Sequence, residues 1–121
     1  MYKICVYVPP SHLEAIKNAL FSAGAGRIGK YQNCSWQILG EGQFKPTANA
    51  QPYLGTVNQL ATVQEYRVEM VCAARYIRAA ITALVAAHPY EQPAYDCWKV
   101  AKIETTHEAV ETHATTPNQN T

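Results

Sequence analysis

The stretch His88-Pro89-Tyr90-Glu91-Gln92-Pro93-Ala94-Tyr95-Asp96 separates an apolar, helix-like segment from a shorter, strand-like one. Proline fixes φ and lacks a backbone N–H, so Pro89 and Pro93 are expected to end the helix and stiffen the turn. The turn carries an imidazole, a phenol and a carboxylate, which together could form a binding site. The same groups could instead satisfy the backbone around a helix end, and composition alone favours this structural interpretation.

On the N-terminal side of this turn, residues 73–87 predict a helix. Its apolar stripe consists of Ile77, Ile81, Leu84 and His88. A histidine at this position can pack on the core and also interact favourably with the negative end of the helix dipole. On the C-terminal side, residues 94–103 predict the last strand.

Two earlier segments, residues 2–8 and residues 63–72, alternate side chains with the period of a β-strand. Between them, Ser11 and Glu14 form a capping-box pattern that predicts the start of a helix. Gly24 predicts the end of the same helix, because glycine adopts the left-handed conformation of a helix terminus without strain.

Residues 33–39 predict another strand, which is expected to break at a turn or bulge over residues 40–42 and to continue over residues 43–45. The order of elements is therefore strand, helix, interrupted strand, strand, helix, strand. This order predicts an α+β fold of the ferredoxin-like type, βαββαβ, with an antiparallel sheet and two helices on one face.

The face of this sheet that the helices leave uncovered is expected to be more apolar than a surface in contact with water. Tyr7, Tyr95, Cys97 and the aromatic residues of the second strand are assigned to it. Exposed apolar sheet faces commonly mark subunit contacts, so the sequence predicts a homo-oligomer.

The composition is that of one globular domain. Of the 121 residues, 48% are hydrophobic and 16% are charged, and the net charge of +1 gives no reason to expect nucleic acid or a membrane as partner. Residues 1–103 are predicted to form the domain, and the polar residues 104–121 a mobile tail. The N-terminal segment is too short for a signal peptide and no apolar run reaches the length of a membrane span, so a cytoplasmic location is expected.

The four cysteines lack the Cys-x-x-Cys spacing of zinc and redox sites. Cys5, Cys72 and Cys97 lie in predicted strands, where a reduced cysteine behaves as a small buried apolar residue. The pattern Gly24-x-Gly26-x-x-Gly29 matches a dinucleotide fingerprint, but it follows a helix where that fingerprint follows a strand. It therefore predicts a helix C-cap and a crossover loop.

Five motifs, which follow one another along the chain, resemble the motifs of one protein family. They are Gly24-x-Gly26-x-Ile28-Gly29-x-Tyr31-x-x-Cys34-Ser35, Gly40-x-Gly42-x-Phe44-x-Pro46, Pro52-x-x-Gly55, Arg67-x-Glu69, and His88-Pro89-Tyr90-Glu91 with Ala94-Tyr95-Asp96. They are similar to motifs of the Ngg-interacting-factor-like group, the YqfO/YbgI-type dinuclear-metal proteins. The resemblance covers residues 2–103, and it is to the insert domain that larger members carry between their two metal-binding halves.

The resemblance implies a ferredoxin-like fold similar to the PII signalling proteins and the CutA copper-tolerance proteins, both of which form trimers by packing sheet against sheet. It does not carry over an enzymatic activity, because the metal-binding halves of the larger members have no counterpart here. Gln92-Pro93 also stands where many relatives have a second acidic residue and an aliphatic one.

These observations favour a small, non-catalytic binding or regulatory module that forms a homo-oligomer, with a trimer favoured. The candidate ligand-binding residues are Tyr31, Cys34, Glu69, His88, Tyr90 and Glu91. An alternative is a CutA-like copper or zinc site formed by His88, Glu91 and Cys34, whose imidazole, carboxylate and thiolate suit either divalent metal. A third hypothesis, an enzyme with these three residues as base, orienting group and nucleophile, requires that they meet in space.

Overall fold

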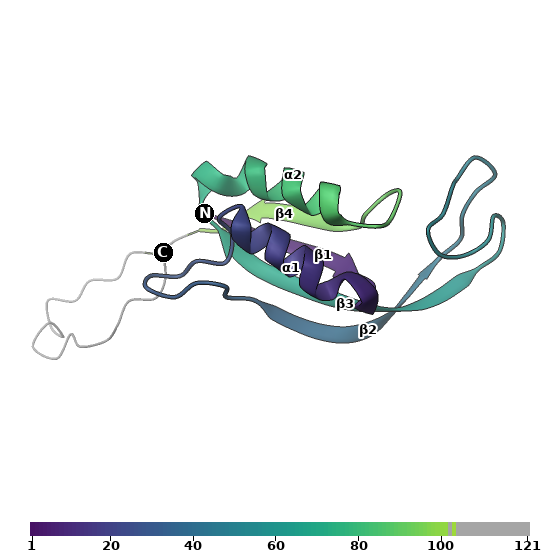
Figure 1. Cartoon of the computed structure of the whole chain (residues 1–121), viewed down its shortest axis with the longest axis horizontal. Coiled ribbons are helices and arrows are strands. Elements are labelled where there is room, and N and C mark those ends of the chain that lie inside the picture. The colour runs from purple at the N-terminus through teal and green to yellow at the C-terminus, as the bar shows by residue number, and fades with distance from the viewer. Residues whose placement is uncertain (102, 104–121) are drawn as a thin grey trace, which may run out of the picture.

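The computed structural model describes residues 1–101 and 103, so the tail predicted at residues 104–121 lies outside the described residues. The elements in chain order are β1 (Tyr2–Val8), a 3₁₀ turn (Pro10–His12), α1 (Leu13–Ser22), β2 (Trp36–Phe44), β3 (Ala61–Cys72), a second 3₁₀ turn (Ala74–Tyr76), α2 (Ile77–Ala87) and β4 (Tyr95–Lys99). Both helices lie on the same side of the strands (Figure 1). Within the described part of the chain, neither helix is long and apolar enough to cross a membrane.

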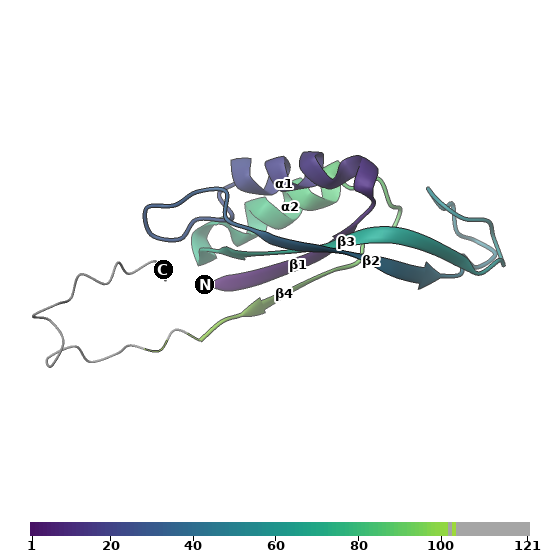
Figure 2. The same cartoon turned by 90° about the horizontal axis from the view of Figure 1, so that it is seen from below.

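The four strands form one antiparallel sheet in the order β2-β3-β1-β4. Seen along the sheet, α1 and α2 cover one face and leave the other without any helix (Figure 2). The predicted ferredoxin-like βαββαβ fold is thereby confirmed. We call the uncovered side the outer face of the sheet.

The hydrophobic core lies between the helices and the two central strands. It is built from alternate residues of β1 and β3, from one stripe on each helix and from Ala25 in the loop after α1. The buried apolar residues are Ile4, Val6, Val8, Leu13, Ile16, Leu20, Ala25, Val68, Met70, Cys72, Ala80 and Leu84. The two periods in the sequence, two residues for strands and about 3.6 residues for helices, therefore correctly predict which strand and helix side chains face the core.

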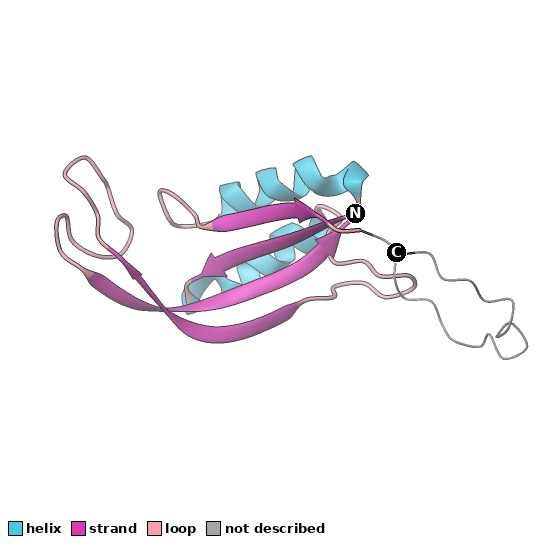
Figure 3. Ribbon diagram, turned by 180° about the vertical axis from the view of Figure 1, so that it is seen from behind, coloured by secondary structure: helices cyan, strands magenta, loops and turns pink. Residues whose placement is uncertain are grey.

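Strands β2 and β3 form a long ribbon that extends beyond the rest of the sheet (Figure 3). Their pairing runs from Trp36 opposite Glu69 to Phe44 opposite Ala61 without interruption. The predicted break at residues 40–42 is therefore wrong. Glycine disfavours a strand only weakly, and here the missing side chains leave room for Glu65 to lie across Gly42.

The start of the first helix also differs from the prediction. The Ser11 hydroxyl bonds the Nδ1 atom of His12 at 2.8 Å, so the predicted capping box with Glu14 does not form. Among the described residues, no side chain caps α1. The preceding 3₁₀ turn begins at Pro10 and satisfies the first backbone groups instead, because the N–H of His12 bonds the carbonyl of Pro9 at 3.0 Å.

The register of β4 corrects the assignment of the outer face. Tyr95 and Cys97 lie opposite Val6 and Ile4, which belong to the core, so both face the helix side. Trp98 takes the outward position, because successive side chains of a strand point to opposite faces. β4 is also shorter than predicted, since it ends at Lys99.

The cysteines are all free thiols, and two of the three strand cysteines are buried as predicted, namely Cys5 and Cys72. The prediction is wrong for Cys97, which is exposed because β4 is an edge strand.

Candidate functional site

His88 connects the end of α2 to the central strand of the sheet. Its Nε2 lies 2.8 Å from the backbone oxygen of Tyr7, and its Nδ1 lies 3.2 Å from the backbone nitrogen of Tyr90. A carbonyl can only accept and an amide N–H can only donate, so Nε2 carries the proton and Nδ1 accepts. Both ring nitrogens are therefore occupied, and only 7% of the residue is exposed.

The surroundings of His88 favour its neutral form. Burial is the largest influence and lowers the pKa of His88, and the nearby His12 acts in the same direction. The hydrogen bond to the Tyr7 carbonyl and the charge of Glu65 act in the opposite direction but do not cancel the effect of burial. His88 is thus a neutral structural link at neutral pH rather than a free base or a free metal ligand.

The lowered pKa of His88 predicts a pH-dependent stability. The unfolded chain binds this proton with a pKa of about 6.5 and the folded chain with a lower one. The contribution of His88 is therefore complete above the unfolded pKa and is lost as the pH falls through it toward the folded pKa. We expect the difference in unfolding free energy between the wild type and His88→Ala to shrink as the pH is lowered from 8 to 5, which urea titrations at each pH would measure. A constant difference would contradict the neutral assignment.

Tyr90 joins the turn to the extended ribbon. Its hydroxyl donates to Oε2 of Glu65 on β3 at 3.0 Å, and its ring centroid lies 4.7 Å from that of His88. Burial, followed by the hydrogen bond and charge of Glu65, raises the pKa of Tyr90 far above its ordinary value. The phenol therefore stays protonated and acts as a permanent donor.

The loop over residues 45–60 rests on this turn. The N–H of Gln51 donates to Oε1 of Glu91 at 2.8 Å. The ring of Tyr53 lies 6.2 Å from that of Tyr90 and meets the ring of His12 edge-on at 5.9 Å. Four rings from three segments, those of His12, Tyr53, Tyr90 and His88, thus form a continuous row, which we call the aromatic row.

Three members of this site were absent from the sequence-based candidates, namely Glu65, Tyr53 and His12. One signal could have pointed to Tyr53, because it lies inside the Pro52-x-x-Gly55 motif. Nothing in the local pattern marks Glu65 or His12, since each becomes part of the site only when distant segments fold together.

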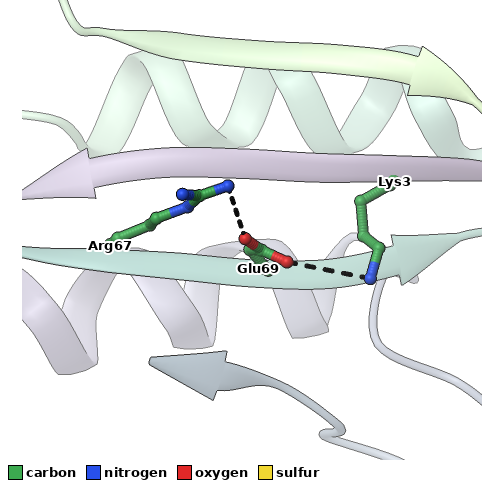
Figure 4. Close-up of polar contacts among 3 residues, drawn as sticks. All are labelled: Lys3, Arg67 and Glu69. Atoms are coloured by element: carbon green, nitrogen blue, oxygen red, sulfur yellow. Dashed lines mark ion pairs between the residues drawn. The ribbon is translucent and has the colours of Figure 1, made fainter. Parts of the chain in front are cut away.

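Glu69 lies elsewhere, on the outer face of the sheet. Its carboxylate is 2.8 Å from Nη2 of Arg67 and 3.8 Å from Nζ of Lys3, so it holds the two cations on either side (Figure 4). These pairs are partly exposed and each contributes at most about 1 kcal/mol. Glu69 therefore orders charges on the outer face and does not belong to the His88 turn.

A shallow hollow of about 260 Å³ opens on the outer face beside this ion-pair group. Its lining residues are Tyr7, Ile38, Gly40, Glu41, Gly42, Glu65 and Arg67. Two adjacent outward positions of β2 carry no side chain, which creates the depression. Glu65 belongs to both sites, since it lines the hollow and accepts the hydrogen bond of Tyr90.

Tyr31 and Cys34 lie at the other end of the sheet. The N–H of Cys34 donates to the carbonyl of Gly26, and the N–H of Gly26 donates to that of Val71, each at 2.8 Å. Val71 pairs with Lys3 of β1, whereas His88 bonds the carbonyl of Tyr7, four residues further along the same strand. Four strand residues span roughly 13 Å, so the loop that carries Cys34 and the turn that carries His88 are attached to β1 about that far apart.

One chain therefore does not bring Cys34 together with His88 and Glu91, either as metal ligands or as a catalytic triad. Within residues 1–101 and 103, no three His, Cys, Asp or Glu side chains are grouped so that they could hold a metal ion. Only an arrangement in which different subunits supply these residues could assemble the trio, and His88 would then have to release a hydrogen bond.

Comparison with known proteins relates the chain to part of a larger protein. No family model matches the chain. The GTP cyclohydrolase 1 type 2 homolog of Mycobacterium leprae is 48% identical over 94 residues, which are 78% of this chain and 24% of that protein. That of Bacillus subtilis is 43% identical over 98 residues, 81% of this chain and 26% of the relative. The chain thus spans about a quarter of the length of these curated relatives.

Solved structures show the same relationship. A Bacillus cereus protein related to NIF3 superimposes with a TM-score of 0.72 at 39% identity, over 84% of this chain and 26% of its own. CutA from Xylella fastidiosa gives a TM-score of 0.59 at 24% identity, over 85% of this chain and 86% of its own. The GlnK–ATP complex of Bacillus subtilis gives a TM-score of 0.53 at 8% identity, over 83% of this chain and 82% of its own. The last two likenesses concern the fold alone. The chain is therefore homologous to the insert part of the GTP cyclohydrolase 1 type 2 homologs and NIF3-related proteins, and it has the PII/CutA-like fold.

Proposed function

We propose that the chain is a small binding or regulatory module, without catalytic activity of its own, that assembles as a homotrimer through the outer face of its sheet. The observation that carries this proposal is the apolar character of a face that no helix covers (Figure 2). Trp36, Ile38 and Trp98 project from this face and are 56%, 53% and 44% exposed. Three large apolar side chains on one flat face are typical of a subunit contact.

The same face also carries groups that give a contact its orientation. Lys3, Arg67 and Glu69 lie between the apolar side chains of β2 and those of β4, because β1 and β3 are the central strands. Charged pairs of this kind add specificity to an apolar interface more than they add affinity. The likeness to CutA and GlnK in fold supports an assembly in which such sheets meet.

A ligand of this module would bind where loops gather, and the turn over residues 88–93 supplies the groups for it. Glu91 and Tyr53 are exposed there, and Tyr90 offers a ring face beside them. GlnK has been crystallised with ATP, so ATP is the first ligand to test. The separation of Cys34 from His88 and Glu91 supports a role without catalysis, although the relatives that share this segment are called cyclohydrolase homologs.

The assembly is tested by Trp36→Glu, which places a carboxylate on the outer face at the β2 edge of the sheet. Since burying an unpaired charge costs several kcal/mol, we expect association to weaken by at least about 100-fold, from a trimer to a monomer at micromolar concentration. Light scattering measures the mass. Val85→Glu is the matched control, because Val85 is 44% exposed on α2 and lies away from the outer face.

A wild-type monomer in the same experiment would disprove the proposed trimer, and a Trp36→Glu trimer would show that a different surface is used. Metal analysis of the same sample, purified without an affinity resin, tests the copper or zinc alternative. A stoichiometric metal that is lost in His88→Ala would favour that alternative over the metal-free module.

A further inference from the structure

Two arginines from different segments converge on one tyrosine ring near the N-terminal end of α2. The guanidinium carbon of Arg75 lies 4.8 Å from the ring centroid of Tyr76, and that of Arg27 lies 5.3 Å from the same centroid. Arg75 belongs to the 3₁₀ turn before α2, whereas Arg27 belongs to the glycine-rich loop after α1. We call these three residues the arginine–tyrosine cluster.

The glycine-rich motif holds this cluster in place. Gly24 has φ +111°, and a Cβ at this position would lie 2.6 Å from the Cγ of Tyr76, so the ring packs directly against the backbone. Gly26 has φ +78° and is tied to the sheet through Val71. The residue that follows, Arg27, therefore starts from a fixed backbone position. The glycines thus have a role even though the motif is not a dinucleotide fingerprint.

The two stretches of sequence that supply the cluster carry charge of one sign. The sequence has no acidic residue between Glu14 and Glu41, nor between Glu69 and Glu91. The cations in these two stretches are Lys17, Arg27, Lys30, Arg75 and Arg78. Of these, Lys17 is paired with Glu14, and the ion pairs among the described residues include neither Arg27 nor Arg75.

We propose that the arginine–tyrosine cluster binds the phosphate groups of a small anionic ligand. A guanidinium presents its N–H donors as a fork that matches phosphate oxygens, and here two forks are exposed and preorganised on one ring. The ligand is a small molecule rather than a nucleic acid, because the net charge is +1 and only two arginines meet at the Tyr76 ring, which is too few for an extended basic track. This inference goes beyond the proposed function, uses different residues and does not depend on the oligomeric state.

The phenol of Tyr76 provides a reporter inside the cluster. Hydrogen bonding and positive charge from Arg75, followed by the charge of Arg27, lower the pKa of Tyr76. A bound anion would offset that positive charge and shift the pKa of Tyr76 upward. The difference in tyrosinate absorbance between the wild type and Tyr76→Phe, followed against pH with and without the anion, isolates this residue.

The test is calorimetric titration of the full chain with inorganic pyrophosphate in a chloride buffer. We expect saturable binding to one site per chain, weakened at least about tenfold by Arg27→Gln and by Arg75→Gln, since each removes a charge-assisted pair of hydrogen bonds. Arg78→Gln is the matched control. It removes the same charge from an exposed position on α2, outside the cluster, and should weaken binding less than about threefold.

Three results would overturn the proposal. They are no heat of binding at millimolar pyrophosphate, equal weakening by Arg78→Gln and the two cluster variants, or binding without any change in the titration of Tyr76. Circular dichroism verifies that the variants are folded, which is expected because both arginines are exposed. Light scattering on the same samples measures the oligomeric state, so a failure of pyrophosphate binding can be distinguished from a failure of the proposed trimer.

Discussion

Replacing His88 with alanine is expected to lower the free energy of unfolding by about 3 kcal/mol at pH 8. The substitution leaves two partly buried backbone groups without the His88 partner, the carbonyl of Tyr7 and the N–H of Tyr90. It also removes a ring that packs 4.7 Å from the ring of Tyr90 and lies at the end of the core stripe of α2. Each effect alone is destabilising, and they act at the same place.

Urea denaturation at pH 8 measures this loss, and His12→Ala is the matched control. His12 is also a histidine of the aromatic row, but it is only partly buried, and among the described residues its side chain bonds only that of its neighbour Ser11. We expect its replacement to cost less than about 1 kcal/mol. If both variants lost the same stability, the two hydrogen bonds of His88 would not be the source of its effect.

The sequence predicts the fold well because the fold depends on periodicity. Residues 2–8 and 63–72 alternate clearly, and both become central strands: β1 has the predicted bounds, and β3 begins two residues earlier than predicted. The pattern fails where tertiary structure overrides local preference. Gly40 and Gly42 look like a strand break, yet β3 pairs with them residue by residue and supplies the Glu65 side chain that crosses Gly42.

The sequence predicts the site less completely because a site is made of distant contacts. The sequence points to the turn, in which the N–H of Tyr90 bonds His88 and Glu91 bonds the N–H of Gln51. Their partners, such as Glu65 and Gln51, lie 25 and 40 residues away, so no local pattern can reveal them. For the same reason the sequence could suggest Cys34 as a ligand beside His88, although the two lie at opposite ends of the sheet.

Gly26→Ala is expected to destabilise the chain by about 2–4 kcal/mol. Part of the cost is conformational, because φ is +78° and a residue with a Cβ is strained there. The rest is steric, since the added Cβ would lie 2.7 Å from the Phe21 ring and 3.0 Å from the carbonyl oxygen of Cys34. Neither neighbour can retreat easily, because Phe21 packs on the core and the Cys34 backbone bonds that of Gly26.

Gly55→Ala separates the two contributions, because Gly55 also has positive φ, +90°, but is exposed, and an added Cβ would come no closer than 3.2 Å to its nearest neighbour, the edge of the Phe44 ring. Its replacement should cost only about 1 kcal/mol, mainly the conformational part. Urea denaturation compares the two variants, and equal losses of stability would show that the steric contacts of Gly26 are not rigid.

Because Arg27 follows Gly26 directly, any displacement that relieves the clash in Gly26→Ala should move the guanidinium of Arg27 away from Tyr76. Gly26→Ala should therefore also weaken pyrophosphate binding, whereas a variant that unfolds more easily but binds as before would show that the loop adjusts without moving Arg27.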